Sequence, residues 1–333
     1  MEARLIDPFD DAQLTRWHEV VEVGMKHERP WISVPPLESD QQRFRESVSF
    51  DRSEALAVFD GDEMVAAGFV VINLLGNLDK AWGAVAVEPR HRRRGYGSAL
   101  VELAAERARA AGAAYLFMQS SYPLEQRETH PYRRFAEANG FAHDQDEIYR
   151  VLDLPVSSEL LDRLAGEAAP HHAGYRIETW LYDVPEQYLD SWIAVHNLLS
   201  LDAPQGVVAW DEDGMDRASY AEERDQLEKL GRAFYTTVAI SPDEEVVAYS
   251  DLVLQAPGTG RVSQWGTLVR RDHRGHRLGT AVKVRNLQEV QRRHPERTEV
   301  HTTNAEVNAA MVGINEVLGF RAVAVHPGFY RRL

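Results

Sequence analysis

Along this chain, apolar residues recur either at the spacing of a helix or in short runs typical of strands. The same order of helical and strand segments occurs twice. Each half has an acidic, amphipathic stretch of helical period, followed by apolar runs separated by turn residues, a pattern that indicates strands. A further strand then meets a basic loop containing glycine, followed by a helix, a short strand, another helix and a last strand. We therefore expect two units with the same order of elements, each combining a sheet with helices on both sides.

The predicted elements fall at matching places in the two halves. In the first half we expect helices over residues 11–27, 97–111 and 131–139, and strands over residues 55–59, 64–73 and 115–119. In the second half we expect helices over residues 185–199, 215–231, 279–294 and 308–318, and strands over residues 234–240, 246–254 and 298–303. This order predicts an α/β (α+β) fold with an N-terminal domain over residues 1–155, a linker over residues 156–173 that includes a short helix, and a C-terminal domain over residues 174–333.

A weak internal repeat supports the division into two domains. The segment from His91 to Gly97 matches the segment from His273 to Gly279 at a shift of 182 positions, and a Gly-Phe pair further on recurs at a shift of 179 positions. This period is far too long for a solenoid, so two similar domains in tandem explain it better. The length of 333 residues agrees with about two domains.

Composition narrows the classes of function. The formal net charge of −15 would repel the backbone of nucleic acids, so we expect no nucleic-acid partner. No apolar run is long enough to span a bilayer, and the first residues lack a signal-peptide pattern, so we expect no membrane partner. Cysteine is absent, which excludes disulfides and zinc–sulfur sites and makes the cytoplasm the expected location. We also expect no metal.

The basic loop of the first half has the features of a phosphate-binding site. Gly95 and Gly97 allow backbone amides to approach a phosphate closely, because neither residue carries a Cβ atom. The N-terminus of the following helix adds unpaired N–H groups and a partial positive charge, and three arginines precede Gly95. The loop lacks the ending of a nucleoside-triphosphate loop and the glycine spacing of a dinucleotide fold. It indicates a small ligand that carries a pyrophosphate, or else only a helix start with a tight turn.

The motif Arg-x-x-Gly-x-Gly from Arg92 to Gly97 lies at a strand-to-helix junction and resembles the signature of the GCN5-related N-acetyltransferase (GNAT) superfamily. The resemblance covers both halves, so the chain is similar to tandem acetyltransferases, and it implies a mixed, mostly antiparallel sheet in each domain. It also implies acetyl-CoA as the donor and direct transfer to an amine. The residues implied to hold the cofactor in the first half are Val85, Ala86, Val87, Arg92, Arg93, Arg94, Gly95, Tyr96, Gly97 and Ser98.

The second loop departs from this signature because Arg277 stands where the first glycine belongs. The side chain of Arg277 would either crowd the pyrophosphate of acetyl-CoA or point away from it and pair with the 3′-phosphate of the same molecule. Asn304 and Asn308 stand where the family commonly bonds the cofactor arm, although Asn308 would equally cap the next helix and Asn304 would make a turn. The residues implied for the second half are Leu268, Val269, Arg274, Gly275, His276, Arg277, Gly279, Thr280, Asn304 and Asn308.

Direct transfer to an amine needs a base that removes a proton and an acid for the departing thiolate. The family commonly uses a tyrosine five residues before the phenylalanine of the Gly-Phe pair, but Ala136 and Asn315 occupy these two places. Substitute candidates stand on predicted strands, and each has a plain structural alternative, as a core aromatic or as a solvated or satisfied sheet residue. These candidates are Tyr149, Asp251, His301 and Tyr330.

These features together predict an acetyl-CoA-dependent N-acetyltransferase that acts on a primary amine of a small molecule, as a monomer or a homodimer. The acidic surface would favour a cationic acceptor. Two alternatives stay open at this point. One is a non-catalytic protein that binds or senses acyl-CoA, which agrees with the two missing tyrosines. The other is an acetyltransferase that acts on a protein amine.

Overall fold

In the computed structural model, which describes residues 1–255 and 259–333, the chain divides into two compact units. Unit 1 consists of Met1–Asp146, Gly206–Val208 and Ala324–Leu333, and unit 2 consists of Glu147–Gln205 and Ala209–Val323. Neither unit is one continuous stretch of sequence, because the end of the chain belongs to the first unit. Among the described residues, no helix combines the length and the apolar composition that a membrane span needs.

Unit 1 contains a mostly antiparallel sheet with the strand order β1-β2-β3-β4-β5-β12, in which β4 and β5 run parallel. Alternate residues of one strand face different helices: Leu56 and Val58 pack with α3, whereas Ala55 and Ala57 pack with α1. The strands are β1 (Glu2–Leu5), β2 (Asp51–Asp60), β3 (Glu63–Asn73), β4 (Lys80–Val87), β5 (Tyr115–Gln119) and the later part of β12 (Arg321–Arg332). The helices are α1 (Asp11–Lys26), α2 (Leu37–Arg45), α3 (Tyr96–Ala110) and α4 (Pro131–Ala138).

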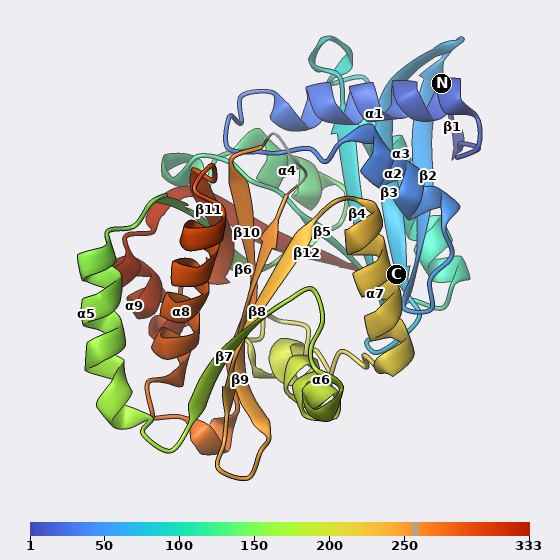
Figure 1. Cartoon of the computed structure of the whole chain (residues 1–333). Helices are drawn as coiled ribbons and strands as arrows, with labels where there is room; N and C mark the ends of the chain where they lie inside the picture. The colour runs from blue at the N-terminus through green and yellow to red at the C-terminus, as the bar shows by residue number, and fades with distance from the viewer. Residues whose placement is uncertain (256–258) are drawn as a thin grey trace. The chain divides into compact units, whose positions relative to one another are not determined.

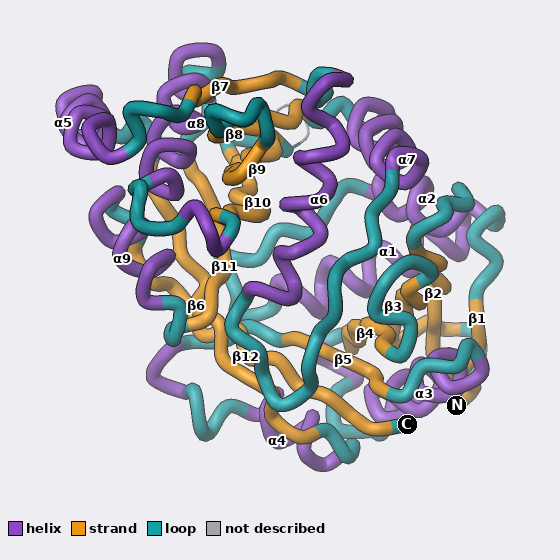
Figure 2. Tube along the Cα trace, turned by 90° about the horizontal axis from the view of Figure 1, so that it is seen from below, coloured by secondary structure: helices purple, strands orange, loops and turns teal. Residues whose placement is uncertain are grey.

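Unit 2 repeats this arrangement with the strand order β6-β11-β10-β9-β8-β7, in which β10 and β11 run parallel. Leu252 of β9 packs in a cluster with Leu287 of α8, whereas Tyr249 packs with Trp192 of α6, so α8 and α6 cover opposite faces (Figure 2). The strands are the later part of β6 (Ala142–Asp153), β7 (Arg176–Leu181), β8 (Ala233–Ile240), β9 (Val246–Leu254), β10 (Arg261–Val269) and β11 (Glu299–Ala305). The helices are α5 (Ser158–Ala168), α6 (Glu186–Asp202), α7 (Arg217–Lys229), α8 (Leu278–Arg293) and α9 (Ala309–Leu318).

The last strand of each half of the sequence belongs to the unit that the other half builds. In unit 1, β12 pairs antiparallel with β5, and Tyr330 stands opposite Phe117. In unit 2, β6 pairs antiparallel with β11, and Tyr149 stands opposite Thr303. The sequence does not predict this exchange, because the apolar alternation of a strand fixes which face is buried and leaves the choice of partner strand open.

The predicted linker helix is α5, and it is an integral part of unit 2. The side chain of Ser157 caps it by accepting a hydrogen bond from the amide of Leu160. Leu161 and Leu164 are buried in the same apolar cluster as residues of α8. Gln291 of α8 also forms two hydrogen bonds with the backbone that leads into α5, at 2.6 and 3.2 Å. Figure 1 shows α5 and α8 side by side.

The predicted bounds of strands β5 and β9 agree with the structure, and the ends of the predicted helices of both units lie within about three residues of the observed ones. The structure adds β1, α2 and β7, which the apolar pattern does not predict. Both added strands lie at sheet edges, and the side chains of β1 and β7 are exposed or half-buried. Edge strands of this kind lack the strong apolar alternation on which the prediction depends.

Candidate active site

The basic loop of unit 1 joins β4 to α3 and presents backbone amides at the start of the helix. Gly95 directly precedes α3 with a φ of 87°, and Arg93 has a φ of 65°. Among the described residues, the amides of Arg93, Arg94 and Gly95 donate to no carbonyl or side chain. Free N–H groups in a loop with left-handed residues form a concave arrangement that binds anions. The geometry of this loop therefore fits a pyrophosphate.

The loop of unit 2 has the same backbone conformation although its sequence differs. Gly275 has a φ of 88° and Arg277 has a φ of 51°, at the positions equivalent to Arg93 and Gly95. Each loop therefore places one glycine and one arginine in the left-handed region, with the two residue types exchanged. A residue with a Cβ atom costs about 1–2 kcal/mol in this region. The departure of the second loop from the family signature thus leaves the path of its backbone unchanged.

The side chain of Arg277 points toward α5 and not over its own loop. Its Nη1 donates to the carbonyl oxygen of Glu167 at 3.1 Å. The neighbouring ring of His276 donates through Nδ1 to the carbonyl oxygen of His171 at 3.0 Å. Of the two orientations expected from the sequence, the structure has the one that points away from the loop amides, with a peptide carbonyl as the partner.

The first arginine of each loop braces the end of a strand. In unit 1, Nε of Arg92 donates to the carbonyl of Val87, and Nη2 donates to the carbonyl of Gly24 on α1, each at 3.2 Å. In unit 2, Nε of Arg274 donates to the last carbonyl of β10 at 3.3 Å, and Nη2 lies 2.5 Å from a carboxylate oxygen of Asp202. These contacts hold each loop in place, and the charge of Arg274 is already paired.

Helix packing explains the second glycine of each loop. A Cβ atom at Gly97 would lie 3.1 Å from the ring of Phe135 on α4, and a Cβ atom at Gly279 would lie 3.3 Å from Cδ1 of Ile314 on α9. From the sequence we expect the close approach of a phosphate at Gly97, whereas the structure shows the close approach of a neighbouring helix. Tyr96 points into the core, where its hydroxyl donates to a carboxylate of β2 at 2.6 Å.

The parallel strands of each unit diverge before the loop. In unit 1, β4 and β5 pair only as far as Gly83, so residues 85–87 have no partner on this side among the described strands. In unit 2, β10 and β11 pair only as far as Ser263, which leaves residues 268–269 open in the same way. An extended ligand arm can pair with such an open edge as an added strand. The strand residues implied for the cofactor therefore stand at open edges in both units.

A β-bulge distinguishes the open strand edge of unit 2 from that of unit 1. The register between β10 and β9 shifts between Gln264 and Thr267, so Trp265 and Gly266 both stand opposite Asp251. The register between β4 and β3 continues without a shift. Bulges re-aim side chains and are frequent beside active sites. Unit 2 thus combines an open strand edge with a local distortion that unit 1 lacks in its described β4.

The two candidate asparagines of unit 2 already have structural roles. Asn304 is buried, and its Oδ1 accepts from Nη1 of Arg150 at 3.0 Å and from Nδ2 of Asn315 at 3.2 Å. Asn308 caps α9 by accepting from the amide of Met311 at 3.2 Å. The cap agrees with the plain alternative for Asn308. The buried network around Asn304 was not expected, and it uses the residue that stands in place of the family tyrosine.

The candidate tyrosines lie in opposite units from those that their sequence positions suggest. Tyr330 comes from the end of the chain but lies in unit 1, where its ring packs against Tyr115 and Phe117 at centroid distances of 6.3 and 6.4 Å. Tyr149 comes from the first half but lies in unit 2. The exchange of β6 and β12 causes both placements, so each tyrosine has the neighbours of the other half.

Tyr149 and His301 form a hydrogen-bonded chain with Glu299. Nε2 of His301 lies 2.9 Å from Oε2 of Glu299, and Nδ1 lies 2.9 Å from the hydroxyl of Tyr149. Because a carboxylate only accepts, Nε2–H donates to Glu299, and Nδ1 accepts from the tyrosine. Burial and the positive charge of Arg261 lower the pKa of His301, so its ring is neutral at pH 7. This chain can pass a proton from the half-buried hydroxyl of Tyr149 to the half-exposed carboxylate of Glu299.

Asp251 is a fully buried carboxyl in the middle of β9. It is 2% exposed, and its Oδ1 has no hydrogen-bond partner among the described residues. Burial raises the pKa of Asp251 to about 8, although the nearby charge of Arg224 acts in the opposite direction. A carboxyl with a pKa near the working pH is suited to take a proton in a reaction.

Asp251, His301 and Tyr149 share one face of the sheet. Val253 of β9 stands in register with Ser263 of β10, which in turn stands in register with His301 of β11, so the three residues face the same side. Asp251 lies two residues from Val253 and therefore also faces this side. Val253 packs against a residue of α7, which identifies the side as the one covered by α6 and α7. Tyr149 stands in register with Thr303, two residues from His301, so it faces this side as well, and three of the four candidates share one face.

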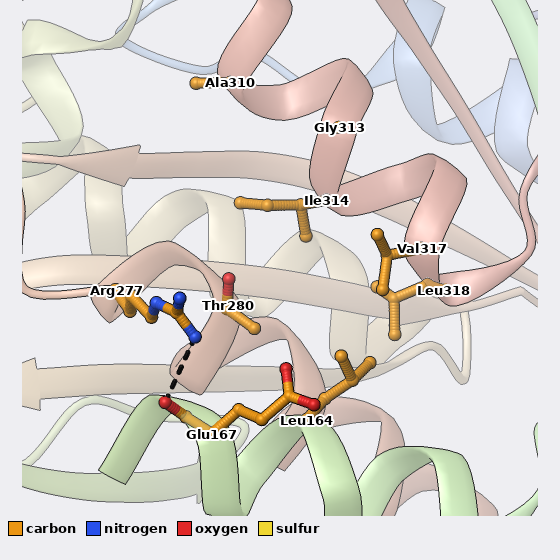
Figure 3. Close-up of a pocket in the computed structure, with 9 residues that line it drawn as sticks. All are labelled: Leu164, Glu167, Arg277, Thr280, Ala310, Gly313, Ile314, Val317 and Leu318. Carbon is orange, nitrogen blue, oxygen red and sulfur yellow. Dashed lines mark hydrogen bonds between the residues drawn. The ribbon is translucent and has the colours of Figure 1, made fainter. Parts of the chain in front are cut away.

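A cavity of about 300 Å³ lies beside the loop of unit 2 on the other face. Figure 3 shows Arg277 and Thr280 at the start of α8 on one side and residues of α9 and α5 around the rest. The lining residues are Leu164, Glu167, Arg277, Thr280, Ala310, Gly313, Ile314, Val317 and Leu318. The cavity is polar near the loop and apolar between the helices, so it offers room for a ligand that extends from the loop amides.

Three potential metal ligands also come together in unit 1. Atoms of Glu63, Glu88 and His91 lie within 4.8 Å of one another. Arg90 pairs with Glu63 at 2.6 Å and with Glu88 at 2.8 Å, and Arg16 forms a further ion pair with Glu88. Two guanidinium groups therefore already neutralise these carboxylates, and we assign no metal to them.

Comparisons with known proteins agree with this geometry. The acetyltransferase (GNAT) family matches residues 21–141, which contain the loop and the open strand edge of unit 1. The chain is similar to the solved structure of a tandem GNAT protein from the clavulanic acid biosynthesis pathway, with 25% identity and a TM-score of 0.75 over 99% of this chain and 98% of that chain. A GCN5-related N-acetyltransferase from Sphaerobacter thermophilus shares the fold, with 17% identity and a TM-score of 0.64 over 99% of this chain and 95% of that chain. No curated protein gave a match.

Proposed function

We propose that this chain, which is similar to tandem-domain GNAT acetyltransferases, transfers an acetyl group from acetyl-CoA directly to the primary amine of a small molecule. The proposal assigns the transfer to unit 2. One observation carries this assignment: Asp251, His301 and Tyr149 face the same side of the sheet, and Asp251 stands opposite the bulge beside the open strand edge. In unit 1 the tyrosine candidate, Tyr330, packs among other aromatic rings.

In this proposal the loop amides and the open strand edges hold acetyl-CoA. The free amides beside Gly95 and Gly275 suit its pyrophosphate, and the edges at residues 85–87 and 268–269 suit its pantetheine arm. When bound, acetyl-CoA supplies an activated thioester carbonyl. The equal backbone conformation of the two loops supports a donor site in each unit.

Asp251 is the proposed base and Tyr149 the proposed acid. An amine attacks a thioester only in its neutral form, so its ammonium must first lose a proton, which the ionised carboxylate of Asp251 can take. The nitrogen then bonds to the carbonyl carbon, the carbon–sulfur bond breaks, and the departing sulfur needs a proton. The hydroxyl of Tyr149, which lies three strands from Asp251, can supply it through water, and the resulting phenolate regains a proton from solvent.

The test is release of free thiol from acetyl-CoA with a panel of small amines, together with mass spectrometry of the products. We expect thiol release and acetylated amine for at least one amine class, and at least a 100-fold lower kcat for Asp251→Asn, since a general base contributes about 10²–10⁴-fold. The wild-type rate should rise with pH through about 8, and this rise should be absent in the variant. Ser263→Ala, on the same face, is the matched control.

Two outcomes would favour the alternatives. Binding of acetyl-CoA in calorimetry without turnover of any amine would indicate a protein that senses acyl-CoA. Acetylation of lysine-containing peptides but of no small amine would indicate a protein substrate. The cytoplasmic location and the monomeric or homodimeric state stay predictions from the sequence.

A further inference from the structure

We propose that Arg224 and Asp251 recognise a zwitterionic acceptor, namely an α-amino acid or a small molecule with the same adjacent ammonium and carboxylate groups. This inference rests on the proposed function, because it names the class of amine that unit 2 acetylates. It assigns the carboxylate of the acceptor to Arg224 and its ammonium to Asp251.

Arg224 is a buried cation whose hydrogen-bond donors are unused. It lies on α7, is 8% exposed, and none of its Nε, Nη1 and Nη2 atoms has a hydrogen-bond partner among the described residues. Its guanidinium lies 3.5 Å from the centre of the Phe234 ring and 4.7 Å from that of Tyr220. The carboxylate of Glu223 approaches Nη2 only to 3.7 Å. Leaving five donors unpaired in a buried place is costly, so the site fits a bidentate ligand such as a carboxylate.

The aromatic rings around Arg224 hold the guanidinium in a fixed plane. Stacking against a ring face restrains an arginine without using its N–H groups. The guanidinium edge therefore stays available to a planar anion. A lysine in this place would offer a point charge and would lose the two parallel hydrogen bonds that a carboxylate accepts.

Asp251 supplies the complementary group on the same side of the sheet. Its Oδ1 is unpartnered, and it forms no ion pair with Arg224 among the described residues although the charge of Arg224 acts on it. Within the described part of the chain, the hydroxyl of Tyr249 and the indole N–H of Trp192, on the same face, also have no hydrogen-bond partner. Buried polar groups are normally hydrogen-bonded, so this concentration of unused donors and acceptors points to a polar ligand.

The guanidinium of Arg224 and the carboxyl of Asp251, both with unused hydrogen-bonding atoms among the described residues, together select a zwitterion. A simple amine would satisfy Asp251 and leave the guanidinium unpaired, and a simple carboxylate would do the reverse. A molecule with both charges pairs each group and brings its nitrogen beside Asp251, opposite the bulge at Trp265 and Gly266. Trp265 is 40% exposed and its ring contacts that of the buried Phe234, so the cluster lies beneath an exposed aromatic side chain.

The experiment compares amines that differ only in the carboxylate. Acetyl transfer is measured for L-phenylalanine against 2-phenylethylamine, L-lysine against cadaverine, L-histidine against histamine and L-alanine against ethylamine. The same compounds are titrated calorimetrically into the protein with coenzyme A present. In at least one pair we expect kcat/KM to be about 10- to 100-fold higher for the amino acid, the range for a hydrogen bond to a charged group. Arg224→Met should remove that preference, and Arg224→Lys should restore part of it.

Arg217→Met is the matched control, because Arg217 lies on the same helix but is exposed in ion pairs with Glu186 and Asp190. This variant should keep the wild-type preference. Circular dichroism establishes that each variant is folded.

The outcomes separate this inference from the proposed function. If simple amines are acetylated as well as their amino acids, or if Arg224→Met keeps the preference, the zwitterion site is wrong while acetyl transfer stands. If no compound is acetylated but amino acids bind to the wild type and not to Arg224→Met, the recognition site stands and the proposed transfer fails. If no amino acid is bound or acetylated, the inference is overturned.

Discussion

The hydroxyl of Tyr149 lies 2.9 Å from Nδ1 of His301, although 152 positions separate the two residues in the sequence. The contact exists because β6, the last strand of the first half, pairs with β11 of the second half. The catalytic face proposed for unit 2 is therefore built by both halves of the chain, and Tyr330, at the corresponding end of the second half, lies in unit 1.

Removal of the Tyr149 hydroxyl should slow the reaction. Tyr149→Phe keeps the ring and deletes the group that donates to His301, so we expect kcat to fall about 10²-fold or more while the affinity for acetyl-CoA stays the same. Tyr330→Phe is the matched control and should retain wild-type kcat. Steady-state thiol release measures both. Equal kcat for the two variants would argue against a role of Tyr149 as the acid.

The two loops should bind two molecules of acetyl-CoA. Gly95 and Gly275 both have positive φ, and a Cβ atom at either position would meet nothing within 4 Å. A large side chain there would consequently fill the space in front of the loop amides. Isothermal titration should give two sites for the wild type and one site each for Gly95→Trp and Gly275→Trp. A single wild-type site, lost in only one variant, would assign the donor to that unit alone.

The stability of the protein should rise with pH because of Lys283. Its Nζ lies 3.7 Å from Sδ of Met311, and burial lowers the pKa of its ammonium to about 7. Between pH 7 and the ordinary lysine value the unfolded chain binds more protons than the folded chain, so the free energy of unfolding increases with pH. Lys283→Met should abolish this increase and stabilise the protein at pH 7 by an amount on the order of a few kcal/mol.

Urea unfolding at pH 7 and pH 9.5 measures this difference. The exposed Lys229→Met is the control and should keep the wild-type pH dependence. A wild type and a Lys283→Met variant with the same change in unfolding free energy between the two pH values would contradict the prediction.

Helix α5 should contribute to the stability of unit 2 as a core helix does. Leu164 is 5% exposed within the apolar cluster that α5 and α8 share. Leu164→Ala should therefore lower the free energy of unfolding by about 2–5 kcal/mol, the usual cost of such a cavity. The exposed Glu159→Ala, on the same helix, should change it by less than about 0.5 kcal/mol. Urea unfolding measures both, and equal small effects would mean that α5 is a loosely attached linker.

The sequence by itself determined the local elements and the loop. Apolar spacing, turn residues and caps act over a few positions, so α1, β5, β9 and the start of α5 follow from nearby residues. The positive φ at Gly95 and the free amides beside it also follow from a local motif. The second loop has the same backbone conformation as the first, as the sequence repeat suggests. Glycine and arginine only exchange places at the two left-handed positions of the loop.

Only the tertiary structure decided which residues meet. The exchange of β6 and β12, the contact of Tyr149 with His301 and the cluster of Asp251 and Arg224 join segments far apart in the sequence. A strand shows in its own sequence which side is buried, but its partner is chosen by packing and backbone hydrogen bonds across the whole sheet. From the sequence, Arg224 is an ordinary charge of a polar helix. Its burial with no hydrogen-bond partner among the described residues results from the packing of α7 over β8 and β9.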